Sequence, residues 1–151
     1  MKKIAIAIAS DHAGFHGKEA IKLILTEMGV AYDDFGADSE ASVDYPDYAE
    51  RVGRAVAAGE YERGILVCGT GIGMEIAANK VPGIRAALVW NEETARLART
   101  HNDANIITVG ERTTPPATID QIIRTFLTAE FAGGRHARRI EKIANLEKGG
   151  Q

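Results

Sequence analysis

Residues 64–80 read GILVCGTGIGMEIAANK, in which an apolar run ends at the only cysteine of the chain and three glycines follow within five residues. The run at residues 64–67 is typical of a buried strand, and the glycines predict a turn that leads into a helix. Such a turn exposes backbone N–H groups beside the positive end of the helix, so residues 69–73 are a candidate anion cradle. The same field favours a thiolate, which makes Cys68 a candidate base or nucleophile. The alternative is an inert thiol, because cysteine is among the most buried residues.

The glycine turn departs from the two common nucleotide-binding loops. The dinucleotide fingerprint G-x-G-x-x-G needs a third glycine where Met74 stands, and the phosphate loop G-x-x-x-x-G-K-S/T is absent. A nucleotide site stays open as an alternative reading of the glycines, because a lone G-x-G-x-G pattern is weak evidence.

Short apolar runs alternate with helical patterns along the whole chain. Further strands are predicted at residues 4–10, 30–35, 84–89 and 105–109. Apolar residues recur at helical spacing in three sets: Ile21, Ile24, Leu25 and Met28; Tyr48, Val52, Ala55 and Val56; and Ile119, Ile122, Ile123, Phe126 and Leu127. A last helix is expected from about residue 135 to residue 148, with Ile140, Ile143 and Ala144 on one side.

This alternation predicts right-handed βαβ units and a parallel sheet that is covered on both faces. We therefore expect an α/β fold, a Rossmann-like three-layer α/β/α sandwich with a five-stranded parallel sheet, built as a single domain over residues 1–151. Ligands of such sheets bind beyond the carboxyl ends of the strands. Four segments are expected to share that rim: SDHAG (10–14), CGTGIG (68–73), WNEE (90–93) and GERT (110–113).

Composition is that of an ordinary water-soluble protein, with 45% hydrophobic residues and a formal net charge of −3 over 151 residues. Nucleic acid is therefore not expected as a partner. The apolar run near the start is too short for a membrane span or a secretion signal, so no membrane partner is expected. A single cysteine cannot form an intrachain disulfide, which agrees with a reducing compartment, and we expect the protein in the cytoplasm.

Asp11, His12 and His101 lie in polar neighbourhoods next to predicted element ends. Each has an ordinary alternative: the aspartate can cap a helix, and the histidines can be surface or capping residues. No pair of candidate ligands has a familiar zinc spacing, and Cys68 lacks a C-x-x-C partner, so no metal is expected.

The segment GGRHARRIEK (133–142) carries a pair of arginines near the start of the last predicted helix. Arg135 and Arg139 are four apart and share a helix face, and guanidinium groups match phosphate geometry. Cations in a first helical turn oppose the helix dipole, so the pair suggests a bound anion. Arg112 could join this phosphate group. The alternative is a solvated basic face, which is how we interpret Arg138 and His136.

Six segments in order, SDHAG, DYPDYA, GILVCGTGIG, IAANKVPGIRAA, HNDANI and GGRHARR, resemble the ribose-5-phosphate isomerase type B family. The wider family includes galactose-6-phosphate and allose-6-phosphate isomerases. The resemblance runs nearly end to end. It implies an aldose–ketose isomerase that interconverts ribose 5-phosphate and ribulose 5-phosphate through an enediolate, with no metal and no organic cofactor.

The resemblance also implies a role for each matching residue. Cys68 would move the proton between C1 and C2, and His101 would donate a proton in opening the furanose ring. The other implied contacts are Gly69, Thr70, Gly71, Ile72 and Gly73 for the enediolate oxygens, Asp11 and Asn102 for sugar hydroxyls, Tyr45 for the pocket wall, and His12, Arg112, Arg135 and Arg139 for the phosphate. Members of the family form homodimers whose active sites draw on two chains, and the dimers often pair into tetramers.

Glu75 departs from the family pattern, which has a small residue at this position. If its carboxylate faced Cys68, it would oppose thiolate formation. Three alternatives to the ribose 5-phosphate assignment stay open. They are isomerisation of another sugar phosphate (allose 6-phosphate, galactose 6-phosphate or a tetrulose phosphate), a non-catalytic sugar-phosphate-binding module, and an enzyme that uses Cys68 as a covalent nucleophile.

Overall fold

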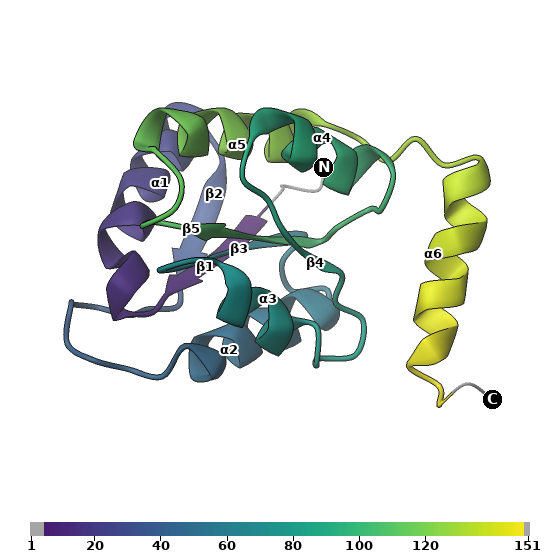
Figure 1. Ribbon diagram of the computed structural model, residues 1–151, viewed down its shortest axis with the longest axis horizontal. Coiled ribbons are helices and arrows are strands. Elements are labelled where there is room, and N and C mark those ends of the chain that lie inside the picture. The colour runs from purple at the N-terminus through teal and green to yellow at the C-terminus, as the bar shows by residue number, and fades with distance from the viewer. Residues whose placement is uncertain (1–4, 150–151) are drawn as a thin grey trace.

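The computed structural model describes residues 5–149, which form a five-stranded sheet with helices on both faces (Figure 1). All neighbouring strands pair in parallel, in the order β2-β1-β3-β5-β4. The strands are β1 (Ala5–Ser10), β2 (Ala31–Asp34), β3 (Arg63–Cys68), β4 (Ala86–Leu88) and β5 (Ile106–Gly110). The predicted parallel α/β sandwich is confirmed.

The helices are η1 (His12–Gly14), α1 (Phe15–Glu27), α2 (Tyr45–Ala57), α3 (Ile72–Ala78), α4 (Glu92–Thr100), α5 (Pro116–Thr128) and α6 (Arg135–Leu146). Figure 1 shows α1, α4 and α5 on one side of the sheet and α2 and α3 on the other, while α6 projects from one end. In the described part of the chain, no helix is long and apolar enough to cross a membrane.

Two predicted strands are shorter in the structure. The run predicted at residues 84–89 contributes only β4, because the N–H of Arg85 donates to the Asn105 side chain at 2.8 Å instead of pairing with another strand. The run at residues 30–35 contributes only β2. The first predicted strand begins at residue 4, which lies outside the described residues.

Alternating strand residues build a separate core on each face of the sheet. Ile65 and Val67 pack with α1, α4 and α5 residues, whereas Leu66 and Cys68 pack with α2 and α3 residues such as Met74. This period of two follows from strand geometry. It turns the Cys68 side chain toward the α2 and α3 face.

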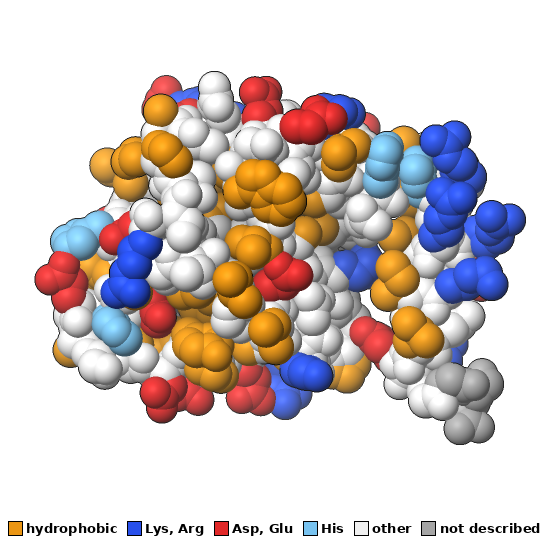
Figure 2. All heavy atoms as spheres, viewed as in Figure 1, with side chains coloured by type: hydrophobic (Ala, Val, Ile, Leu, Met, Phe, Trp, Pro, Cys, Tyr) orange, Lys and Arg blue, Asp and Glu red, His pale blue; other side chains and the backbone are white. Residues whose placement is uncertain are grey.

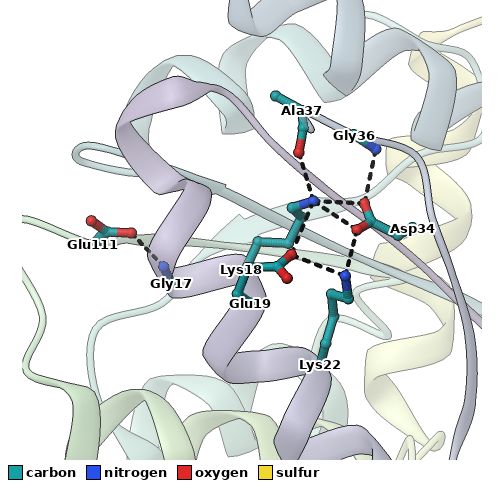
Figure 3. A network of polar contacts seen from close by, with 8 residues as sticks. All are labelled: Gly17, Lys18, Glu19, Lys22, Asp34, Gly36, Ala37 and Glu111. Carbon is teal, nitrogen blue, oxygen red and sulfur yellow. Dashed lines mark hydrogen bonds and ion pairs between the residues drawn. The ribbon is translucent and has the colours of Figure 1, made fainter. Parts of the chain in front are cut away.

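A buried lysine fixes the segment that leads from β2 to α2 (Figure 3). The side chain of Lys18 is only 1% exposed, and its Nζ donates to Asp34 Oδ1 at 2.8 Å, to Asp34 Oδ2 at 2.7 Å and to the Ala37 carbonyl at 2.7 Å. Asp34 also accepts from the Gly36 N–H at 2.9 Å and from Lys22 Nζ at 2.8 Å. A buried ammonium is tolerated only with such partners. The network therefore fixes the end of β2 and the start of the loop to α2.

Burial would raise the pKa of the Asp34 carboxyl, but hydrogen bonds from Lys18 and Lys22 outweigh it and hold this pKa below its usual value. A lowered pKa in the folded state means that the ionised carboxylate stabilises the fold at neutral pH. This contribution is complete above the pKa of the unfolded chain and is lost as the pH falls through the folded value.

We expect Asp34→Asn to lower the free energy of unfolding at pH 7 by roughly 3 kcal/mol, the lower end for breaking a buried ion pair, because the Asp34 side chain is 22% exposed. Denaturant titrations at several pH values measure this. The difference from the parent protein should begin to shrink below about pH 4, the pKa of an aspartate in the unfolded chain, and should be lost as the pH falls through the lower pKa of folded Asp34. Asp120→Asn, which removes a half-exposed ion pair with Arg124, is the control and should cost less than about 1 kcal/mol. A difference that stays constant down to pH 2 would contradict the analysis.

Candidate active site

A cavity of about 470 Å³ opens at the carboxyl ends of β1 and β3. It is lined by the start of η1, the end of β3 with the turn that follows, part of α3, the first residue of α2 and one residue after β5: Asp11, His12, Ala13, Tyr45, Cys68, Gly69, Thr70, Ile72, Gly73, Ile76 and Arg112. Three of the four segments expected to share this rim do line the cavity. The fourth, WNEE, follows the edge strand β4 and is not among the lining residues.

Cys68 is the last residue of β3, and its side chain reaches the cavity although the residue is only 5% exposed. The N–H of Gly71 donates to its Sγ at 3.1 Å. The carbonyl of the same Gly71 accepts from the buried Thr108 hydroxyl at 2.8 Å, which holds this residue from the β5 side. The sulfur thus has the positive end of a backbone dipole as its partner.

The close packing of the β3–α3 turn requires glycine at two positions. Gly71 has a φ of 81°, in the left-handed region, and a Cβ there would lie 2.5 Å from Leu88 Cδ1. A Cβ on Gly73 would lie 2.6 Å from the ring of Tyr45, the first residue of α2. The aromatic ring therefore lies directly against the turn and forms one wall of the cavity.

Asp11 and His12 are oriented by backbone groups. Asp11 is buried and caps η1 by accepting from the Gly14 N–H at 3.0 Å, so its capping role and its place in the cavity coexist. Nδ1 of His12 accepts from the Val43 N–H at 3.2 Å. A neutral imidazole with an accepting Nδ1 carries its proton on Nε2, which leaves an N–H donor available to an anion.

Arg112 lies across the glycine turn. The backbone N–H of Arg112 donates to the Gly69 carbonyl at 3.0 Å. A Cβ on Gly69 would lie 3.1 Å from Nη1 of the Arg112 guanidinium. Thr70 is exposed, and its hydroxyl accepts from the Ile72 N–H at 3.2 Å. The turn, the guanidinium and His12 together form a concave surface with several N–H donors, which suits an anionic ligand.

The structure places four predicted site residues away from this cavity within one chain. His101 and Asn102 precede β5, and since the strands are parallel they lie at the opposite edge of the sheet from Cys68, which pairs with the last residue of β5. Five strand residues separate these edges by about 16 Å. Arg135 and Arg139 lie on α6, where Figure 2 shows Lys and Arg side chains gathered at the end of the molecule.

The sequence placed His136 on a solvated face; in the structure it is half-buried and has an aromatic partner. Its ring stacks on that of His101, with centroids 4.3 Å apart and planes at 15°. Desolvation, followed by the positive charges of His101, Arg135 and Arg139, lowers the pKa of His136. The start of α6 is therefore a concentrated positive site. The sequence signal was available, since His136 lies between the two arginines that suggested a phosphate.

Glu75 does not face the cysteine. Its Oε2 accepts from the Leu88 N–H at 2.9 Å, and it lines a separate cavity of about 320 Å³ together with Asn102 and Ile143. The Glu75 carboxylate is thus engaged at β4 and does not oppose thiolate formation in the way that the sequence left open.

Within residues 5–149, no group of three or more His, Cys, Asp or Glu side chains is placed to hold a metal ion. A smaller cavity of about 250 Å³ lies between α1 and α5, lined by residues such as Ala20, Ile24 and Ile119. It is mainly apolar and has neither a cysteine nor an arginine in its lining, so the Cys68 cavity is the better candidate for chemistry. The expected absence of a metal or cofactor stays a prediction.

The sequence pattern of the Ribose/Galactose Isomerase family matches residues 6–143. The chain belongs to this family. The resemblance read from the six sequence motifs is thereby confirmed, and with it the expectation of an isomerase.

Relatives of the isomerase match it over nearly their whole length. It is 51% identical over 144 residues to a Bacillus subtilis homologue of sugar phosphate isomerases, covering 95% of this chain and 97% of that one. Ribose-5-phosphate isomerase B of Escherichia coli is 45% identical, with 98% of both chains covered. The structure of Clostridium thermocellum ribose-5-phosphate isomerase B superposes with a TM-score of 0.96 at 49% identity, covering 98% of this chain and 100% of that one.

The structure of Mycoplasma genitalium ribose-5-phosphate isomerase B was solved with bound ribulose-5-phosphate. It superposes with a TM-score of 0.93 at 43% identity, covering 98% of this chain and 99% of that one. The fold is thus shared with enzymes that bear the name ribose-5-phosphate isomerase B. The individual roles of Cys68, His101 and the phosphate-binding residues stay predictions for this isomerase.

We expect Gly71→Ala to lower the free energy of unfolding by roughly 2–4 kcal/mol, because it adds left-handed backbone strain to crowding against the Leu88 side chain and against the Val109 backbone, 3.1 Å from the new Cβ. Chemical denaturation measures the loss. Gly29→Ala is the matched control, since Gly29 has a similar φ of 71° with no atom near its Cβ position, and should cost only about 1–2 kcal/mol. Equal losses in the two variants would mean that the turn yields to a side chain and is not fixed as described.

Proposed function

We propose that this protein is an aldose–ketose isomerase that interconverts ribose 5-phosphate and ribulose 5-phosphate. The observation that carries the proposal is Cys68, whose sulfur faces the cavity at the carboxyl ends of the strands with the Gly71 N–H as its partner. Relatives that are 43–49% identical and bear the name ribose-5-phosphate isomerase B support the choice of sugar. One of them holds ribulose-5-phosphate in its structure.

The proton transfer follows from this arrangement. The Cys68 thiolate takes the proton from C2 of the open-chain aldose, and negative charge develops on the carbonyl oxygen at C1. N–H groups of the 69–73 turn donate to the enediolate oxygens, which is where charge accumulates in the transition state. A proton then passes from the C2 hydroxyl to the C1 oxygen, the Cys68 thiol returns its proton to C1, and the ketose forms with its carbonyl at C2. A base that acts in both directions at one face of the sugar needs no redox partner.

Binding of the phosphate and opening of the sugar ring need further residues, some of which lie far from the Cys68 cavity within one chain. We propose that His101 donates the proton that opens the furanose ring, that Asn102 and Asp11 bind hydroxyls, and that Arg135 and Arg139 join His12 and Arg112 at the phosphate. Remote binding of the phosphate would anchor the reacting carbons at the sulfur.

A homodimer would bring the two groups together. The helix α6 has no buried residue, and its Ile143 and Leu146 are exposed. The cavity rim is also apolar, with exposed Tyr45, Ile72 and Ile76, and Figure 2 shows hydrophobic side chains gathered on this face. Apolar surfaces of this kind are typical of interfaces. In the proposed dimer, the start of α6 and His101 of one chain complete the cavity of the other, while pairing of dimers and a cytoplasmic location stay predictions from sequence.

We expect the protein to convert ribulose 5-phosphate in deuterated water into ribose 5-phosphate labelled at C2, as read by NMR. Cys68→Ala should lower kcat by roughly 100- to 10,000-fold, because it removes the base. Cys68→Ser keeps the shape with a much weaker acid and should be similarly slow. Near-normal turnover by Cys68→Ala would show that the base is another group. Faster turnover of allulose 6-phosphate, tagatose 6-phosphate or a tetrulose phosphate would reassign the sugar, and binding without label uptake would favour a non-catalytic module.

Mixing two inactive variants tests the shared site. We expect Cys68→Ala and the double variant Arg135→Gln/Arg139→Gln each to be nearly inactive alone. After unfolding and joint refolding, the mixture should regain about a quarter of the parent activity, since half of the dimers would be mixed and one of their two sites would be intact. Native mass spectrometry verifies that mixed dimers have formed. Mixed dimers without activity would contradict a site built from two chains.

A further inference from the structure

The turn that carries His101 and Asn102 is held in an unusual backbone conformation by the next residue. Among residues 5–149, Asp103 is the one non-glycine residue with a positive φ, at 47°. The left-handed region costs an L-residue about 1–2 kcal/mol, although Asn and Asp adopt it more readily than others. Such a residue persists only where its surroundings hold it.

Two guanidinium groups from different segments hold Asp103. Nη1 of Arg99, in the last turn of α4, donates to Asp103 Oδ1 at 2.8 Å. Arg85, just before β4, donates from Nη2 to Oδ2 at 3.3 Å and from Nε to the Asp103 carbonyl at 2.9 Å. Both carboxylate oxygens and the backbone carbonyl are therefore bound.

Arg85 and Arg99 together form a clamp on Asp103, and this clamp is anchored in the protein interior. Arg99 is buried and also donates to the carbonyls of Ala104 at 2.9 Å and Ala129 at 3.4 Å. A buried guanidinium without a carboxylate would be costly, so Arg99 and Asp103 need each other. Backbone bonds from the Asp103 N–H to the Arg99 carbonyl at 3.2 Å and from the Ala104 N–H to the Ala98 carbonyl at 2.9 Å complete the turn.

We propose that Asp103 is a positioning residue, which fixes the turn so that His101 and Asn102 are presented at one orientation to the sugar. This rests on the proposed function, in which His101 donates the proton for ring opening. Asp103 itself is bound on the side of Arg85 and Arg99 and does not touch the substrate. Charge-assisted bonds to both arginines supply the orientation that the short exposed turn lacks on its own.

The two sugars separate positioning of His101 from a general loss of structure. Ribose 5-phosphate is mainly a closed furanose and must be opened. Ribulose 5-phosphate is open-chain because its C5 hydroxyl carries the phosphate, so exchange of its C1 hydrogen with solvent deuterium needs the Cys68 base but no ring opening. A positioning role for Asp103 thus affects the first reaction more than the second.

The test uses Asp103→Asn, which keeps the size and tolerates the left-handed region but loses the charge. We expect the ratio of kcat for ribose 5-phosphate to the rate of C1 deuterium exchange in ribulose 5-phosphate to fall at least about tenfold. Arg85→Gln, at a side chain 27% exposed, removes part of the clamp without altering the turn sequence and should lower the same ratio. Arg96→Gln is the control. It breaks an exposed ion pair with Glu93 on α4, the helix that also carries Arg99, and should leave the ratio unchanged.

A second readout does not depend on activity. Hydrogen exchange followed by mass spectrometry should show faster exchange of the amides of residues 101–104 in Asp103→Asn than in the parent protein or in Arg96→Gln. An unchanged ratio, or equal loss of both reactions, would overturn the proposal. A parent protein that fails to convert ribose 5-phosphate would overturn the proposed function instead, and unchanged amide exchange would then still overturn the clamp.

Discussion

The parallel register of β1, β3 and β5 is the constraint on which the candidate site depends. It aligns Ser10 with Val67 and Cys68 with Gly110, so the turns after three strands emerge side by side. The backbones then approach so closely that a Cβ on Gly14 would lie 2.5 Å from the Val67 carbonyl oxygen. The cysteine, the glycine turn and the residues that surround them are thus brought together by strand pairing before any side chain selects a ligand.

Charge is distributed in two different ways around this framework. At Lys18 and at Arg99, a buried cation binds a carboxylate and at least one backbone carbonyl, and each fixes a segment next to a proposed site residue. At the start of α6, by contrast, the arginines are exposed, and desolvation together with the neighbouring positive charges lowers the pKa of His136. Engaged cations stabilise the scaffold, whereas cations without protein partners are suited to binding an anion.

The sequence allowed much of this to be predicted. Alternating apolar runs predicted the parallel sheet, and the rule that ligands bind at the carboxyl ends of strands correctly grouped Asp11, Cys68 and Arg112. The same rule gave no place to His101, because the loops before strands lie at the other edge of the sheet. Asp103 and Lys18 could not be found either. Their importance depends on partners such as Ala37, 19 positions from Lys18, and Arg85, 18 positions from Asp103, and no local pattern predicts those contacts.

Helix α3 has a second role, at strand β4 on one edge of the sheet. Strand β4 is an edge strand, and such an edge exposes peptide groups that can pair with another chain. Asn79 follows the last turn of α3 and accepts from the Ala86 N–H at 2.8 Å, while Glu75 accepts from the Leu88 N–H, so the two alternate donors of the edge are already satisfied. The helix that starts at the glycine turn therefore also guards the fold against strand addition and fibrous self-association, which gives Glu75 a purpose outside catalysis.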